Sequence, residues 1–168
     1  MSTAAEIGLQ IRAAVLDEVN DYWTSKAAID AAEEVWAVDQ AIQEGSEDPP
    51  IKGRRVWVGI EPTGLGRIAA DRGSDYCDIP IRVVVFERYS EGAGPPPTSW
   101  GDDLFKFTHQ LRHRLSDARR DDWGDVVFTS FPPESVETDF DFDPDHWTVL
   151  NTFVAAFVVT YRGEVAED

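Results

Sequence analysis

The tightest restriction on the fold comes from an apolar run near the C-terminal end of the sequence, over residues 147 to 161. Both sets of alternating positions are apolar, so a strand here presents an apolar side chain on each face. One face holds Trp147, Val149, Phe153, Ala155, Phe157, Val159 and Tyr161, and the other holds Leu150, Val154, Ala156 and Val158. A strand of this kind must be covered on both sides. The run therefore predicts a central strand that carries much of the core.

A second central strand is predicted over residues 78 to 89, because its alternating positions also become apolar on both faces midway along the run. Pro80 is expected near the start of this strand, where proline is tolerated. Residues 55 to 61 predict a further strand. Its expected faces carry Val56, Val58 and Ile60 on one side and Trp57 on the other.

Three weaker strands complete the predicted set. Residues 126 to 131 form a short apolar run that ends at Pro132 and Pro133. Residues 136 to 142 alternate apolar with acidic side chains, which predicts a half-buried strand with an acidic outer face. Residues 34 to 41 suit either a helix or a strand by composition, and the run of Val, Trp, Ala and Val favours the strand.

Two amphipathic helices are predicted. The first begins with Thr3 as N-cap and Glu6 completing a capping box, and ends near Asn20 and Asp21. Its buried stripe is expected to be Ile7, Ile11, Val15 and Val19, with Arg12, Asp17 and Glu18 facing solvent. The second helix covers residues 102 to 117, with Asp102 and Asp103 at its positive end and Arg112 and Arg114 at its negative end. Its buried stripe is expected to be Leu104, Phe107, Leu111, Leu115 and Ala118.

The order of helix, strand cluster, helix, strand cluster lacks regular alternation of strands and helices. We therefore predict an α+β protein with a mostly antiparallel sheet of about four to six strands and two main helices packed on it. Residues 1 to 163 are expected to form one domain, followed by a short acidic tail over residues 164 to 168.

The 168 residues include 32 acidic and 15 basic side chains, which gives a net charge of −17. A surface this acidic disfavours tight binding to nucleic acid, although it suits a channel wall past which DNA slides without sticking. Solubility alone is an equally good reason for such a charge. No apolar run approaches the ~20 residues of a membrane span, and the first residues do not resemble a signal peptide, so a cytoplasmic protein is expected.

No motif predicts a catalytic residue, a cofactor or a metal. Residues 64 to 69 match G-x-G-x-x-A but leave little room for a helix, so a hairpin-like turn is favoured over a nucleotide site. His109 and His113 share a helical face without the glutamate of H-E-x-x-H, which favours surface histidines. Residues 139 to 146 lack the Gly and Glu of a calcium loop. Cys77, the single cysteine, has no histidine near it in sequence to act as a base.

The chain resembles the tail terminator and related neck proteins that join head to tail in long-tailed bacteriophages and prophages. The resemblance rests on three segments, which are residues 55 to 62, residues 78 to 88 with the loop and helix that follow, and residues 151 to 162. It implies a virion protein, assembled in the host cytoplasm, that forms a ring, usually of six subunits. The ring would cap the tail tube and contact head-completion or connector proteins, with DNA passing through its lumen.

If the resemblance holds, one edge of the sheet and the second helix are expected to carry subunit contacts. Trp100, Trp123 and Trp147 are candidate interface anchors because tryptophan is enriched at interface hot spots, although each could equally lie in the core. Two other functions remain open. An acidic DNA mimic that inhibits a basic DNA-binding protein would explain the charge, and a small-molecule-binding domain would use residues 64 to 69.

Overall fold

A computed structural model describes ten stretches of the chain, which are residues 4–26, 31–36, 38–46, 53–61, 68–71, 74–89, 94–116, 129–130, 141–142 and 151–164. They contain the helices α1 (Ala4–Lys26), α2 (Val38–Ser46) and α3 (Thr98–Ser116). The strands are β1 (Ala31–Glu34), β2 (Arg54–Ile60), β3 (Ile68–Asp71), β4 (Ser74–Arg88), β5 (Thr129–Ser130), β6 (Asp141–Phe142) and β7 (Thr152–Glu164).

These strands form one mixed sheet in the order β1-β2-β4-β7-β5, with β3 paired to β4 and β6 paired to β7. Only β1 and β2 run parallel, and the other pairs are antiparallel. The α+β class is therefore confirmed. The element counts differ from the prediction, because the described residues contain a third helix, α2, and seven strands, four of which have only two to four residues.

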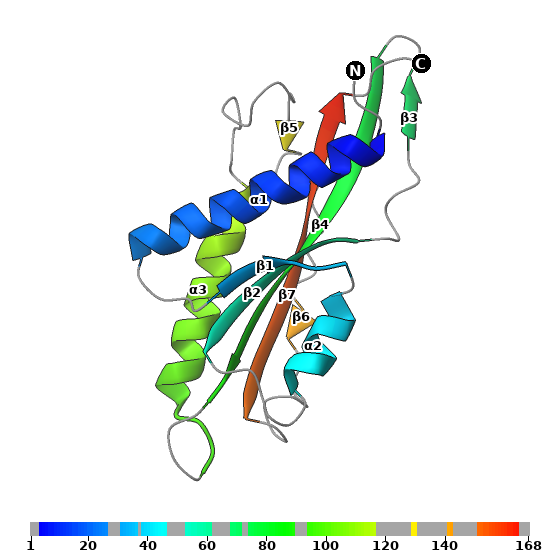
Figure 1. The fold of residues 1–168 in the computed structure, drawn as a ribbon. Coiled ribbons are helices and arrows are strands. Elements are labelled where there is room, and N and C mark those ends of the chain that lie inside the picture. The colour runs from blue at the N-terminus through cyan, green and yellow to red at the C-terminus, as the bar shows by residue number, and fades with distance from the viewer. Residues whose placement is uncertain are drawn as a thin grey trace.

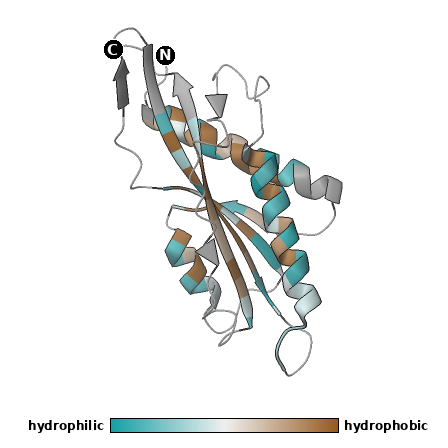
Figure 2. Ribbon diagram, turned by 180° about the vertical axis from the view of Figure 1, so that it is seen from behind, coloured by the Kyte–Doolittle hydropathy of each residue, from teal (hydrophilic) through white to brown (hydrophobic). Residues whose placement is uncertain are grey.

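Helices cover both faces of the sheet. Helices α1 and α3 lie on one side of the strands and α2 on the other (Figure 1). The larger core lies under α1 and α3, where their buried stripes meet one face of β2, β4 and β7. A smaller core lies under α2 and is built around Trp57, Val84, Phe86, Val154 and Ala156. Apolar residues accordingly follow the two long strands β4 and β7 along their length (Figure 2).

The alternation predicted for the two central strands is confirmed over the described residues of the core, whereas Trp147, Val149 and Leu150 lie outside the described residues. In β7, Phe153, Ala155, Phe157, Val159 and Tyr161 belong to the larger core, whereas Val154 and Ala156 belong to the smaller one. The register with β4 preserves this division, because Val83 lies opposite Phe157 and Val84 lies opposite Ala156. Side chains that lie opposite each other on β4 and β7 therefore point to the same face of the sheet, as an antiparallel ladder requires.

Pro80 lies near the middle of β4, six residues from its first residue, and not near its start as predicted. Its carbonyl accepts a hydrogen bond from the amide of Glu61 at 2.9 Å, so this edge of Pro80 faces the end of β2. The nitrogen of a strand residue points to the same side as its carbonyl, and β2 ends at Ile60. Pro80 has no N–H to donate the reciprocal bond to Glu61, so this pair has one ladder bond instead of two and β2 ends just before it.

Helix α1 has the predicted stripe, since Ile7, Ile11, Val15 and Val19 are all buried. Two details are wrong. The helix continues to Lys26 instead of ending near Asn20, and Arg12 and Glu18 are buried although Asp17 is exposed. The physical reason is that neighbouring elements supply opposite charges, with Arg12 bonded to Glu34 and Glu18 bonded to Arg114. The capping residue Thr3 lies outside the described residues.

The prediction of a strand over residues 34 to 41 is wrong. The strand β1 lies earlier, at Ala31–Glu34, and the segment continues into helix α2 from Val38. Val38, Ala41 and Ile42 follow helical spacing and pack on the smaller core, which outweighs the strand propensity of valine and tryptophan. Arg82 on β4 adds a bond from its Nη1 to Asp39 Oδ1 at 3.0 Å, which fixes the start of α2 over the sheet.

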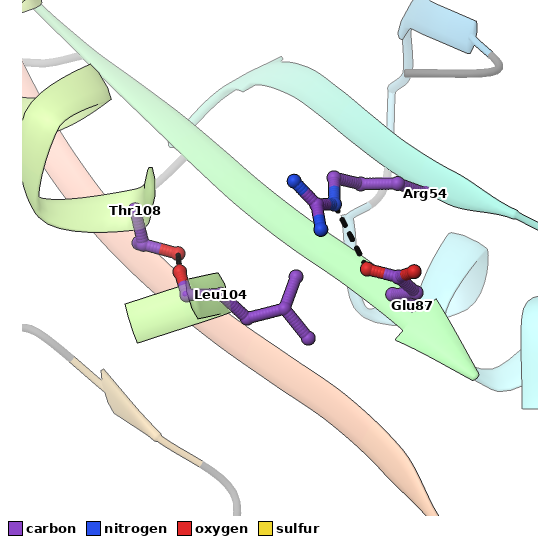
Figure 3. Close-up of polar contacts among 4 residues, drawn as sticks. All are labelled: Arg54, Glu87, Leu104 and Thr108. Carbon is purple, nitrogen blue, oxygen red and sulfur yellow. Dashed lines mark hydrogen bonds and ion pairs between the residues drawn. The ribbon is translucent and has the colours of Figure 1, made fainter. Parts of the chain in front are cut away.

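Helix α3 begins at Thr98, four residues before the predicted start, so Asp102 and Asp103 lie beyond its first turn. The buried stripe of Leu104, Phe107, Leu111 and Leu115 is confirmed, whereas Ala118 lies outside the described residues. Thr108 is also buried, and its hydroxyl donates to the carbonyl of Leu104 at 2.8 Å (Figure 3). This bond back to the preceding turn lets a polar side chain lie in the core without an unsatisfied donor.

The cross-strand pair Arg54 and Glu87 joins α3 to the sheet. The two residues are register partners on β2 and β4, with Arg54 Nε donating to Glu87 Oε2 at 2.8 Å (Figure 3). The guanidinium carbon of Arg54 also lies 5.4 Å from the centre of the Phe107 ring. A cation held by both a carboxylate and an aromatic face stabilises the contact between strand and helix more than an exposed ion pair would.

Tyr161 provides a first stability prediction. Its buried hydroxyl donates to the carbonyl of Leu115 at 3.0 Å, in the last turn of α3, where helix carbonyls lack intrahelical donors. Tyr161→Phe removes this donor with little change in volume. We expect a loss of about 1 to 2 kcal/mol in the free energy of unfolding, measured by urea titration. An unchanged unfolding midpoint would mean that another donor satisfies the Leu115 carbonyl.

Candidate interaction surface

The described residue with the least satisfied hydrogen-bonding groups is Arg12, on the side of α1 that faces β1. It is 8% exposed, and its Nη2 donates to Glu34 Oε2 at 3.1 Å. Its Nε and Nη1 atoms are buried and have no hydrogen-bond acceptor. A buried guanidinium normally has its five N–H groups satisfied by carboxylates, carbonyls or water. Arg12 therefore has donors that this chain, in the form described, does not satisfy.

Trp36 lies beside this guanidinium and is the most exposed of the large apolar side chains described. It is 77% exposed, yet the Arg12 guanidinium carbon lies 4.7 Å from the centre of its ring, within the range of a cation–π contact. The backbone next to it is held in place, because the Val35 amide donates to the Val58 carbonyl at 3.0 Å. The indole is thus presented from an anchored segment.

The strand β1 forms one edge of the sheet and, among the described strands, pairs with β2 alone. Its other edge lies toward solvent or toward parts of the chain outside the described residues. Arg55, the register partner of Ala31, contacts Glu33 at 3.6 Å and has a buried Nε without an acceptor. We call this region the Trp36 edge, and it consists of Arg12, Glu33, Glu34, Trp36 and Arg55.

A second exposed aromatic lies on α3. Phe105 is 48% exposed and contacts the ring of His109 edge-on, with centroids 4.8 Å apart. His109 and His113 are both exposed, as predicted for surface histidines. Within the described ranges, no group of three or more His, Cys, Asp or Glu side chains is arranged to hold a metal ion.

Of the three predicted interface tryptophans, only Trp100 lies in a described part of the chain. It is partly buried, packs against the larger core and contacts the Tyr89 ring at 5.2 Å between centroids. Trp100 is therefore a residue at the margin of the core, and its role in an interface stays a prediction. Trp123 and Trp147 lie outside the described residues.

Sequence reasoning missed Arg12 and Trp36. The sequence pattern predicts a strand at Trp36 and a solvent-facing position for Arg12. The sequence does contain a signal for an exposed tryptophan. Trp36 lies between the acidic pair Glu33 and Glu34 and the helical pattern that begins at Val38. A large aromatic at such a junction has no alternating partner to bury it.

The structure describes only parts of the two sequence motifs that suggested a nucleotide site and a calcium loop. Residues 64 to 67 lie outside the described chain, and β3 follows at Ile68–Asp71 as the partner of β4. A strand at Ile68–Asp71 occupies the place where a dinucleotide site would have a helix, and the predicted hairpin-like turn stays a prediction because most of it lies outside the described residues. Of residues 139 to 146, only Asp141 and Phe142 are described, and they form β6. Cys77 is part of β4, opposite Ile68 and Gly163.

The chain matches no protein-family model, no curated protein and no solved structure. No helix in the described part of the chain is both long and apolar enough to span a membrane. The candidate surface is therefore assessed on its own chemistry, which is that of an edge strand with an exposed indole and a buried cation.

Proposed function

We propose that this protein is a structural component of a phage tail or neck, a ring-forming terminator or joining protein through which DNA passes. The observation that carries the proposal is the arrangement of the three segments on which the resemblance rests. They become β2, β4 with α3, and β7, and these strands are direct neighbours in the sheet. The three segments thus lie next to one another in the structure and form the centre of the sheet.

The Trp36 edge supports the self-assembly that a ring requires. Among the described strands, β1 leaves one edge unpaired, and an unpaired strand edge is a ready template for pairing with another chain. An exposed tryptophan beside it is of a type enriched at interface hot spots. Closed rings arise from a head-to-tail contact between two different surfaces of the same subunit. An edge strand on one side of the sheet is a suitable half of such a contact.

The charge supports the DNA conduit. A ring of six copies with −17 each presents a strongly negative surface, which repels a phosphate backbone and prevents it from sticking to the lumen. Virion location, the partners at the tail tube and connector, and the ring itself are all parts of the proposal.

The test is the molar mass of the purified chain by size-exclusion chromatography with light scattering, followed by negative-stain electron microscopy. We expect ring-shaped particles of about 113 kDa, six times the 18.8 kDa of one subunit. We also expect no retardation of duplex DNA in a gel at physiological salt. One or two subunits at every concentration, together with salt-sensitive binding to a basic DNA-binding protein, would favour the acidic mimic and overturn the ring.

A further inference from the structure

Arg12 combines three properties that are rarely found together in a side chain of purely structural function. It is nine-tenths buried, two of its nitrogens have no acceptor, and its one carboxylate partner, Glu34, is itself about one-third exposed. Burying donors without acceptors is costly, and a carboxylate that is about one-third exposed compensates a buried cation poorly. An acceptor from outside the chain would remove that cost.

We propose that the Trp36 edge is the receiving half of a self-assembly contact, and that it binds a carboxylate-bearing extended segment of a second copy of this chain. Arg12 is the receiving cation, and β1 offers beside it a strand edge with which no other described strand pairs. The Trp36 ring contacts the guanidinium and lies mostly in solvent, so an incoming acceptor that displaces this ring would meet the side of the guanidinium that the indole covers. The indole then packs on the added segment.

Charge identifies the occupant. Each copy carries 32 carboxylates, so a second copy readily supplies an acidic segment to a buried cation whose donors lack acceptors. The net charge of −17 opposes the association of two copies, but each cation at this edge is paired with one carboxylate. Arg12 pairs with Glu34 on the face that α1 covers, and Arg55 pairs with Glu33 on the opposite face, so an acidic segment meets less repulsion there than the overall charge would impose. The assignment of a second copy as occupant rests on the proposed function.

The first variant is Arg12→Met, which keeps an apolar stem and removes every donor. Replacing a poorly compensated buried cation by an apolar side chain is often neutral for stability. We expect the urea midpoint to be unchanged or higher and the self-association constant to fall at least tenfold, measured by sedimentation equilibrium. Arg82→Met is the matched control, because Arg82 contacts two carboxylates, Asp39 and Glu61, and lies outside the Trp36 edge. It should leave self-association unchanged.

Trp36→Ser provides a second route that does not depend on a core change. Because the indole is mostly in solvent, the variant should fold with an unchanged urea midpoint and also associate at least tenfold more weakly. A photo-crosslinking amino acid at position 36 should then form a bond to an acidic segment of a second copy, identified by mass spectrometry of mixed isotope-labelled chains.

The outcomes separate this inference from the proposed function. Rings that form equally well with Arg12→Met and Trp36→Ser would overturn the Trp36 edge as the contact and leave the ring function in place. A dimer that depends on both residues would support the contact and overturn the ring. A wild-type chain that stays monomeric at every concentration, or a position-36 crosslink to added duplex DNA instead of to a second copy, would overturn the contact itself.

Discussion

Phe157→Ala is expected to lower the free energy of unfolding by about 3 to 5 kcal/mol. Phe157 is fully buried in β7, opposite Val83 on β4, in the larger core between the sheet and helices α1 and α3. Removing the ring loses its transfer free energy and leaves a cavity that the rigid strands on both sides cannot close. Urea titration at constant m-value measures this loss.

Val158→Ala is the matched control, one residue further along the same strand. Val158 points to the other face, where it lies opposite Arg82 and is only half-buried. We expect its replacement to cost less than about 1 kcal/mol. Equal losses for the two variants would contradict the division into a larger and a smaller core, because they would place comparable packing on both faces.

The division of the sheet faces could be predicted from the sequence because side chains alternate strictly along a strand. Once the run ending at Tyr161 is assigned as a strand, period two alone fixes which residues share a face. The same holds for the stripe from Ile7 to Val19, which follows the helical period. Periodicity of this kind is a property of one segment, so it can be recognised in the sequence without knowing which other elements pack against that segment.

What could not be predicted depends on partners that are distant in sequence. Arg12 and Glu18 look like surface residues until Glu34 and Arg114 arrive from other elements. The sequence does not predict helix α2, because only four of its positions, Val38, Ala41, Ile42 and Gly45, are apolar or small. Its assignment as a helix depends on the face of the sheet that it covers. The candidate surface was missed for the same reason, since Trp36 becomes notable only when β1 is known to be an edge.

Gly59→Ala is expected to destabilise the protein by about 2 to 3 kcal/mol, in the upper part of the range for overpacking. Gly59 lies in β2, beneath the segment that leads from β1 to α2. A Cβ added there would lie 2.8 Å from Val38 Cγ2 and 3.0 Å from the backbone oxygen of Val35, both too close for ordinary contacts. The backbone neighbour cannot rotate away, so the segment itself must move.

The movement should be visible at a single amide. The Val35 amide donates to the Val58 carbonyl at 3.0 Å, one residue before Gly59, so displacement of the segment should weaken this bond. We expect faster hydrogen exchange at Val35 in Gly59→Ala, with strands β4 and β7 keeping their relative protection. Since Trp36 follows Val35 directly, the same displacement disturbs the proposed contact with a second copy.

Gly8→Ala serves as the control with the opposite sign. Gly8 lies inside α1, and the nearest atoms to an added Cβ would be Ile79 Cδ1 at 3.5 Å, Ile60 Cδ1 at 3.6 Å and Ile79 Cγ2 at 3.8 Å, which are ordinary contact distances. Alanine favours a helix interior over glycine, so we expect a gain of about 0.5 to 1 kcal/mol. A loss in Gly8→Ala would mean that α1 lies closer to the sheet than described. No change in Gly59→Ala would mean that the segment bearing Trp36 is not held against β2, which would remove the anchored geometry that the proposed contact requires.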